Sequence, residues 1–209
     1  MPLPPVREAE HWFVEAATAA VRAGEHLDPL AVELVVALVP HAPFVAAAIE
    51  QVEPLPDEST LAADAHRVCE TLRSGDGRVD PQVARDLVTQ LEERMLPAYR
   101  PGRGMGALED DVAVAHAMAA AHRYGGDDTH LMMAEELMRS VVRRYWSELA
   151  RHPLRIICEA AVVLYALAQQ AEQPEYKARA LEALDAAARG YKDLGWRAAP
   201  FVIALRMIR

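Results

Sequence analysis

The spacing of apolar and polar residues predicts helices along the whole chain. The first helix is indicated by an apolar stripe at helical spacing that ends at Gly24. The stripe consists of Trp12, Ala16, Ala19, Ala20 and Ala23. Further helices are predicted at about 30–39, 43–52, 61–72, 81–96, 108–124, 128–149, 154–171, 174–194 and 197–208. We therefore expect an all-α protein built largely from antiparallel helical hairpins.

A segment rich in glycine and proline interrupts this pattern at 97–107. It is predicted to connect N-terminal helices (1–96) with C-terminal hairpins (108–209) inside a single helical domain, 1–209. Glycines before a helix are also typical of phosphate-binding loops. Here, however, the segment follows a helix rather than a strand, and the next helix opens with three carboxylates that would repel phosphate. We interpret it as a flexible hinge.

The second half contains a weak internal repeat with an offset of 46 residues. At this offset Met118, Ala134, Val141 and Tyr145 fall on Leu164, Ala180, Ala187 and Tyr191. Each unit would be an apolar helix, a tight turn and an amphipathic helix, and neighbouring units must stack to bury their apolar faces. The same offset makes His130 equivalent to Tyr176. Both are predicted to begin the second helix of a hairpin and to pack against the preceding one.

Several short segments in residues 105–208 resemble a known family. They are Leu108-Glu109-Asp110-Asp111, Gly126-Asp127-Asp128-Thr129-His130-Leu131, Tyr145-Trp146, Gln173-Pro174-Glu175-Tyr176 and Arg197-Ala198-Ala199-Pro200. They are similar to hairpins of six-hairpin, glycosidase-like (α/α) toroid proteins, especially the bacterial family that joins a thioredoxin-like domain to a toroid. This chain departs from that family in lacking the thioredoxin-like domain and in having His130 where tyrosine is usual. Since a complete toroid needs about twelve helices, the resemblance implies a partial (α/α) toroid or a helical array.

Charge and apolar length exclude some classes of partner. The net charge is −9 and the pI is about 5.4, which argues against nucleic acid and against an anionic membrane surface. The basic cluster Arg139, Arg143 and Arg144 shares its helix with several glutamates and is interpreted as a solvated face. The apolar runs are too short or too charged to span a bilayer, and the N-terminus lacks an apolar leader. We expect a cytoplasmic protein.

The cysteines and histidines predict neither a metal nor a cofactor. Cys69 and Cys158 are far apart in the sequence and are expected to be buried free thiols. The histidines do not form a His-x-x-x-His pair, and His116 and His122 should point in different directions from one helix. Nucleotide-binding and zinc-binding motifs are also missing from the sequence.

Three carboxylates are weak catalytic candidates. Glu109 and Asp110 lie where a toroid mouth would be, although acids in a first helical turn also complement the helix dipole. Glu159 interrupts an apolar run, so burial could raise its pKa and make it catalytic. Arg155 precedes it by four residues, and a structural ion pair between the two is the favoured interpretation.

These observations favour a noncatalytic helical scaffold or adaptor that binds a protein partner or self-associates. An open array exposes apolar surface at its ends. The best candidates for such a contact surface are the helices near 30–52 and the last helix. In that last helix the expected contact residues are Phe201, Val202, Leu205 and Ile208. The alternative is a small-molecule or carbohydrate-active enzyme that uses carboxylates at the hairpin ends.

Overall fold

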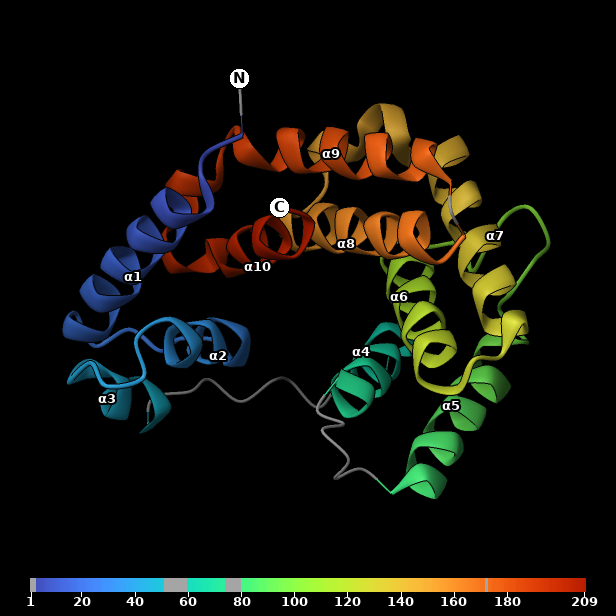
Figure 1. Ribbon diagram of the computed structural model, residues 1–209, viewed down its shortest axis with the longest axis horizontal. Helices are drawn as coiled ribbons and strands as arrows, with labels where there is room; N and C mark the ends of the chain where they lie inside the picture. Colours follow the sequence, from blue (N-terminus) through green and yellow to red (C-terminus); the bar gives the residue numbers. More distant parts are fainter. Residues whose placement is uncertain (1–2, 51–59, 74–79, 172) are drawn as a thin grey trace.

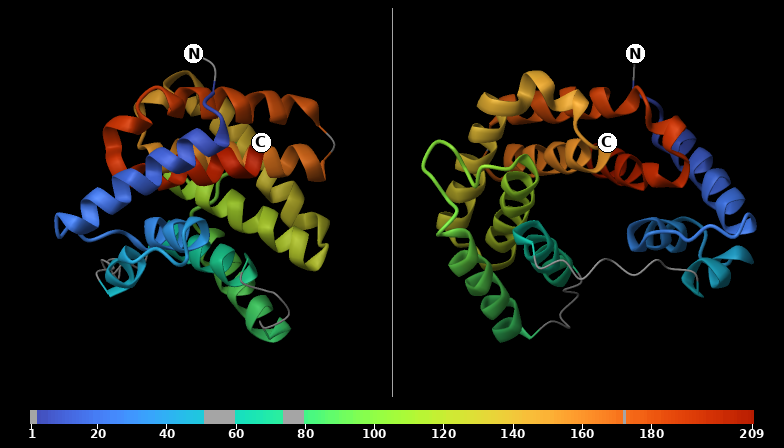
Figure 2. Two further views of the ribbon diagram at one scale, coloured as in Figure 1. Left: turned by 60° about the vertical axis from the view of Figure 1, so that its left-hand side comes forward. Right: turned by 180° about the vertical axis from the view of Figure 1, so that it is seen from behind.

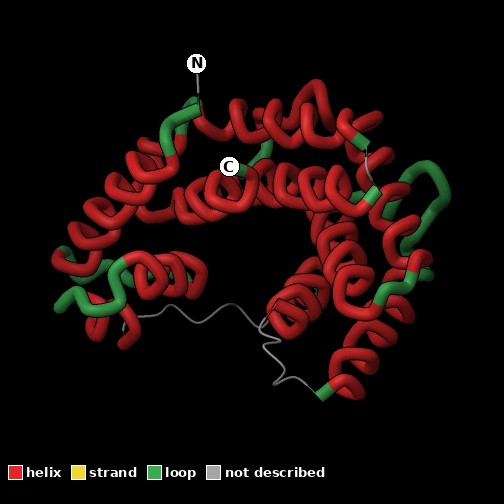
Figure 3. The backbone as a smooth tube through the Cα atoms, viewed as in Figure 1, coloured by secondary structure: helices red, strands yellow, loops and turns green. Residues whose placement is uncertain are grey.

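The computed structural model describes residues 3–50, 60–73, 80–171 and 173–209, and these are almost entirely helical (Figure 3). The helices are α1 (Val6–Arg22), α2 (Pro29–Leu38), α3 (Phe44–Glu50), α4 (Leu61–Arg73), α5 (Pro81–Met95), α6 (Leu108–Gly125), α7 (Asp128–Tyr145), α8 (Leu154–Gln170), α9 (Pro174–Ala188) and α10 (Ala199–Ile208), with 3₁₀ helices η1 (Trp146–Arg151) and η2 (Tyr191–Ala198). Helix accounts for 81% of the structure, and the described ranges contain no strand. The prediction of an all-α fold is confirmed.

The helices form two layers that follow an arc (Figure 1). Helices α2, α10, α8, α6 and α4 lie along its inside, and α1, α9, α7 and α5 lie along its outside, as the view from behind also shows (Figure 2). Along the inner layer, each helix contacts the next in the order α4, α6, α8, α10 and α2. An ion pair of 2.9 Å between Arg73 of α4 and Glu33 of α2 joins the two ends of this layer.

The inner helices α4 and α6 run in the same direction. The backbone N–H of Ala62 donates to Asp110, and further along both helices Cys69 contacts His116. Helices α6 and α8 begin at residues 108 and 154, and α7 and α9 begin at 128 and 174, so both pairs differ by 46 residues. The helix boundaries therefore agree with the offset read from the sequence.

One continuous apolar core runs from α1 to α10. In α1 the face predicted from the sequence is wrong, because Trp12 and Ala16 are only partly buried and Ala19 and Ala23 are exposed. The buried face is instead Ala9, Phe13, Ala17, Ala20 and Val21. It is centred on Phe13, the largest apolar side chain that this helix buries completely.

The last helix is integral to the core. Phe201, Val202 and Leu205 are fully buried and Ile208 is 6% exposed, while Arg206 and Arg209 are exposed. Helix α10 contacts α1, α2, α8 and α9 of the same chain. These four apolar residues are thus covered by the chain itself, which removes them as an exposed surface for a partner. Packing inside the chain accounts for their helical spacing.

Two helices end earlier than the sequence pattern indicates. The helix expected at 128–149 stops at Tyr145 and continues as η1, and the one expected at 174–194 stops at Ala188, just before Gly190. Inside η2, Gly195 has φ of 58°, a left-handed conformation that glycine adopts without steric cost. The amphipathic pattern continues through these turns, so periodicity alone overestimated the helices. The prediction for 43–52 partly lies outside the described residues.

Tyr176 and His130 occupy equivalent positions, each as the third residue of its helix. His130 Nε2 lies 2.9 Å from Glu92 of α5, and the Tyr176 hydroxyl accepts from Arg139 of α7 at 3.5 Å. Each therefore reaches the outer helix of the preceding helix pair. Replacing Tyr176, which is 5% exposed, by alanine should lower the free energy of unfolding by about 3 kcal/mol. Urea denaturation measures this, and a loss below about half a kcal/mol would show that the position is not a packing anchor.

Candidate functional site

Five polar side chains meet between the inner helices α4, α6 and α8. The cluster consists of His66 and Cys69 from α4, His116 from α6, and Arg155 and Glu159 from α8. His66 Nε2 lies 2.9 and 3.0 Å from the two carboxylate oxygens of Glu159, and His116 Nδ1 lies 2.9 Å from Glu159 Oε1. One carboxylate is therefore shared by imidazoles from two other helices.

Hydrogen-bond chemistry fixes the tautomer of His66. The Arg155 guanidinium approaches His66 Nδ1 at 3.0 Å, and a guanidinium can only donate. Nδ1 therefore accepts, and the proton of the neutral ring resides on Nε2, which donates to Glu159. The ion pair expected between Arg155 and Glu159 is replaced by this arrangement, in which His66 lies between the two charges.

The cluster is mostly buried but reaches the surface. The exposed fractions of the side chains are 20% for His66, 27% for His116 and 11% for Glu159. Burial alone would raise the pKa of Glu159, but hydrogen bonds from His116 and His66 hold it well below its usual range. Burial alone would lower the pKa of His116, but contacts with Cys69 and Glu159 raise it to about 10. At neutral pH the pair is an imidazolium and a carboxylate.

The other two candidate carboxylates lie apart from Glu159. Glu109 is exposed in the first turn of α6. Asp110 accepts a 3.2 Å hydrogen bond from the backbone of Ala62 and so helps to cap α4. Asp110 precedes His116 by six residues, which corresponds to about 9 Å along a helix. The structure thus separates the three acids, and it gives Asp110 a structural role.

The two cysteines differ in their surroundings. Neither forms a disulfide, as expected, but Cys158 alone is buried, at 2% exposed, whereas Cys69 is partly exposed. Burial raises the pKa of the Cys158 thiol far above its usual range, so that thiol stays protonated and inert. Cys69 instead lies near the His116 ring and raises the pKa of that histidine. The sequence-based expectation of two buried thiols is therefore correct only for Cys158.

The glycine-rich connector is held by side chains of α7. Arg143 donates to the Gly102 carbonyl at 3.2 Å, Arg144 donates to the Arg103 carbonyl, and the Tyr145 hydroxyl donates to the Gly106 carbonyl at 3.0 Å. The contacts of Arg143 and Arg144 with the connector show that these residues do more than form a solvated face. They also give the connector a defined path where the sequence indicated a hinge.

Asp111 is fully buried beneath this connector. Its Oδ1 accepts a 2.5 Å hydrogen bond from the Met105 N–H. Among the described residues its Oδ2 has no hydrogen-bond partner, and the nearest guanidinium nitrogen, from Arg144, is 3.7 Å away. Gly104 passes directly over this carboxylate with φ of 65°, and a Cβ there would collide with it. Burial, and to a smaller degree Asp110, raises the pKa of Asp111 to about 6, against the opposing effects of the Met105 N–H and Arg144.

The raised pKa of Asp111 predicts a pH-dependent stability. The folded pKa of Asp111, about 6, exceeds the ordinary value of 3.8. The protonated carboxyl therefore contributes stability that is fully present below about pH 4 and is lost as the pH rises through 6. Asp111→Asn keeps an acceptor for Met105 and stays neutral. When the pH is raised from 4 to 7.5, the difference in unfolding free energy between the variant and wild type should shift by about 2 kcal/mol in favour of the variant. Denaturation at both pH values tests this, with Asp193→Asn as control, and an unchanged difference would contradict it.

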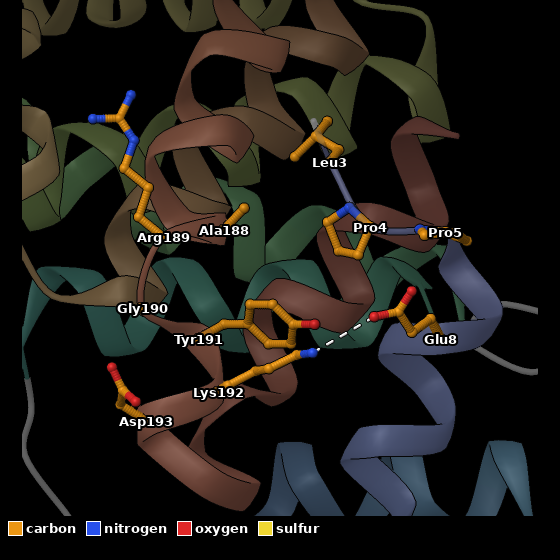
Figure 4. Close-up of a pocket in the computed structure, with 10 residues that line it drawn as sticks. All are labelled: Leu3, Pro4, Pro5, Glu8, Ala188, Arg189, Gly190, Tyr191, Lys192 and Asp193. Carbon is orange, nitrogen blue, oxygen red and sulfur yellow. Dashed lines mark ion pairs between the residues drawn. The ribbon is translucent and has the colours of Figure 1, made fainter. Parts of the chain in front are cut away.

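The structure also has a pocket of about 370 Å³ beside the N-terminal segment (Figure 4). It is lined by Leu3, Pro4, Pro5, Glu8 and residues 188–193. Glu8 and Lys192 form an ion pair of 3.5 Å at its edge, and the buried Tyr191 hydroxyl has no hydrogen-bond partner among the residues that the structure describes. The two carboxylates of this pocket, Glu8 and Asp193, lie well apart in Figure 4, and Glu8 is paired with Lys192, so the pocket does not bring acidic groups together as the α4–α6–α8 cluster brings its polar side chains together.

Within the described ranges, no group of three or more histidine, cysteine, aspartate or glutamate side chains could hold a metal ion. No helix among the described residues is long and apolar enough to cross a membrane.

Searches of protein-family models, of curated proteins and of solved structures each find no match to this chain.

Sequence reasoning found Glu159 but missed its histidine partners. It considered only neighbours on the same helix, whereas His66 and His116 are 93 and 43 residues away. One signal was present in the sequence. His116 is the sole polar residue in the run 112–121, and Glu159 is the sole charged residue in 156–167. Single polar residues in two neighbouring apolar helices are expected to satisfy each other.

Proposed function

We propose that this chain acts on a small anionic molecule at the α4–α6–α8 cluster. The observation that carries the proposal is the sharing of the Glu159 carboxylate between His66 and His116, with Arg155 behind His66. Ionisable groups that converge from three helices and remain partly accessible are typical of a chemical site. This arrangement favours the enzyme alternative over the scaffold.

The charge of the cluster argues for an anion. The His116 imidazolium balances the Glu159 carboxylate, so the Arg155 guanidinium, which lies against His66, adds a positive charge to the cluster. Arg155 is exposed, and within the described part of the chain its side chain hydrogen-bonds only with His66. Its remaining N–H groups are available for a carboxylate or phosphate, which a guanidinium binds with two hydrogen bonds.

We further propose that the two-layered arc is an incomplete (α/α) toroid of helical hairpins. The parallel direction of α4 and α6 and the matching starts of α6 with α8 and of α7 with α9 support this. A cytoplasmic location is proposed as well, and the unpaired state of both cysteines is consistent with a reducing compartment.

Calorimetric titration of the purified chain with acetate, succinate and inorganic phosphate tests the function. At least one anion should bind saturably at pH 7, and Arg155→Ala should weaken it at least about tenfold, the loss of a charge-assisted hydrogen bond. Arg151→Ala is the matched control, since Arg151 is an exposed arginine four residues earlier. The proposal is wrong if no anion binds or if the Arg155 variant binds as well as wild type.

A second candidate is the noncatalytic scaffold that binds a protein partner or a second copy. Exposed apolar side chains favour it: Val36 of α2, Ile49 of α3 and Met207 of α10 are 37%, 54% and 48% exposed. These helices adjoin, because α2 contacts both α3 and α10. Self-association through them predicts a dimer by light scattering that Ile49→Asp dissociates and that Met132→Asp, on α7, leaves intact. A monomeric wild type would restrict this candidate to other partners.

A further inference from the structure

We propose that the pocket beside the N-terminal segment binds a free amino acid with an apolar side chain. This pocket is formed by other residues than the α4–α6–α8 cluster and is a second site. It lies between the start of the described chain, including Glu8 of α1, and residues 188–193, which run from the end of α9 into η2 (Figure 4). Its volume of about 370 Å³ is within the usual range of small-molecule sites, about 300–1,000 Å³.

The buried Tyr191 hydroxyl offers a hydrogen bond that the surrounding side chains leave unused. Tyr191 is 2% exposed, and its ring stacks on Phe201 at 4.4 Å and meets the edge of Trp12 at 5.1 Å. These ring contacts fix the direction of the hydroxyl, which points toward Glu8 and Lys192 in Figure 4 but has no hydrogen-bond partner among the described residues. Because buried hydroxyls are normally hydrogen-bonded, a ligand atom that accepts from Tyr191 would be bound favourably.

The charged groups next to this hydroxyl form one ion pair. Lys192 Nζ lies 3.5 Å from Glu8 Oε1 and 5.8 Å from the centre of the Tyr191 ring. The side chains of Lys192 and Glu8 are 54% and 56% exposed, so water weakens their attraction and the pair can open at little cost. A ligand that takes a place between them meets an ammonium group, a carboxylate and the Tyr191 hydroxyl.

Complementary charge selects a zwitterion for this place. A ligand with a single charge would satisfy either Lys192 or Glu8 and leave the other without its counter-ion. The ammonium and carboxylate of an α-amino acid are attached to the same carbon and lie about 3 Å apart, similar to the spacing of the ion pair. The ligand ammonium would donate to Glu8, and the ligand carboxylate would accept from Lys192 and from the Tyr191 hydroxyl.

The rest of the lining indicates the side chain of the ligand. Leu3, Pro4 and Ala188 present apolar surface to the pocket. In Figure 4 the charged ends of Arg189 and Asp193 point away from these three residues. Burial of an apolar side chain against this surface is favourable, because it removes both surfaces from water. An amino acid such as leucine or phenylalanine therefore fits the pocket better than a charged one.

Calorimetric titration of the full-length chain with L-leucine and L-phenylalanine at pH 7 tests the inference. At least one of them should bind saturably. Its analogue without the amino group and its analogue without the carboxylate should each bind at least about tenfold more weakly, since each loses a charge-assisted hydrogen bond. Glycine should also bind more weakly, because it has no apolar side chain. The inference is wrong if neither amino acid binds, or if glycine or an analogue binds as tightly as the parent.

Variants then place the bound amino acid in this pocket. Tyr191→Phe removes the hydroxyl and keeps the ring that stacks on Phe201. It and Lys192→Met should each weaken binding at least about fivefold, whereas Lys177→Met, a change of the other lysine, exposed on α9, should not. Arg155→Ala should also leave amino-acid binding unchanged. If either pocket variant binds like wild type, the inference fails. If Arg155→Ala abolishes binding instead, the amino acid occupies the α4–α6–α8 cluster, so this inference fails and the proposed anion site stands.

Discussion

Replacing Phe201 by alanine is expected to lower the free energy of unfolding by about 4 kcal/mol, the usual cost of removing a buried aromatic ring. Phe201 is fully buried in α10 and stacks on Tyr191 with 4.4 Å between ring centroids, while Tyr191 meets the edge of Trp12 at 5.1 Å. The alanine variant therefore leaves a cavity where α1, η2 and α10 meet. Equilibrium urea denaturation of both proteins measures the difference.

Met207→Ala is the matched control for Phe201, because Met207 lies on the same helix and is 48% exposed. It should cost less than about 1 kcal/mol, as exposed positions usually do. Deletion of residues 197–209 should have a larger effect and give aggregation, since the apolar faces that α10 covers on α1, α2 and α8 become exposed. A truncated chain that stays soluble with the wild-type melting temperature would contradict the role of α10 in the core.

Replacing Glu159 by leucine should lower the free energy of unfolding by about 3–5 kcal/mol, the usual cost of removing one member of a buried charge pair. Leucine keeps the volume and the helix propensity but leaves His66 and His116 without their acceptor. Glu159→Gln keeps an acceptor for His66 and should have a smaller effect. Glu182→Leu is the control, as Glu182 lies on the outer helix α9 with its side chain 56% exposed.

The pH dependence of the Glu159 effect has a defined sign. The pKa of His116, raised from 6.5 to about 10, gives a contribution that is fully present below pH 6.5 and is lost as the pH rises through 10. The lowered pKa of Glu159 gives a second contribution to stability, which is present above pH 4.5 and is lost as the pH falls through the folded pKa. The stability difference between wild type and Glu159→Leu should therefore be largest between pH 4.5 and 6.5. A difference independent of pH would mean that the loss comes from packing alone.

Local signals were sufficient for much of the fold. Asp28 and Asp80, each followed by proline, accept backbone hydrogen bonds at the starts of α2 and α5. The Asp80 start and the buried face of α10 follow directly from residue order, because caps and helical periodicity act within a few residues. The buried face of α1 could not be predicted from residue order in the same way. Its many alanines fit two adjacent stripes, and only the position of Phe13 in the core selects one of them.

The candidate site was less predictable, since it depends on which helices become neighbours. Glu159 stood out as a charge in an apolar run, but its same-helix neighbour Arg155 was assigned as its partner. In the structure, α4 and α6 supply the two partners through His66 and His116. The contrast between Cys69 and Cys158 has the same origin. Both cysteines lie in helices, and the neighbouring helix decides which of them meets an imidazole.

The contact between α1 and the last described helix has a consequence for biosynthesis. Helix α1 contacts η2 and α10, and the Trp196 indole N–H donates to Glu25 across 171 residues of sequence. On the ribosome, α1 therefore emerges long before the elements that cover it. At about 5–20 residues per second the interval is on the order of 10–40 s. Of the described elements that pack on the apolar face around Phe13, α2 and α3 are made early and η2 and α10 are made last, so α1 is a segment of the nascent chain on which a chaperone would act for a long time.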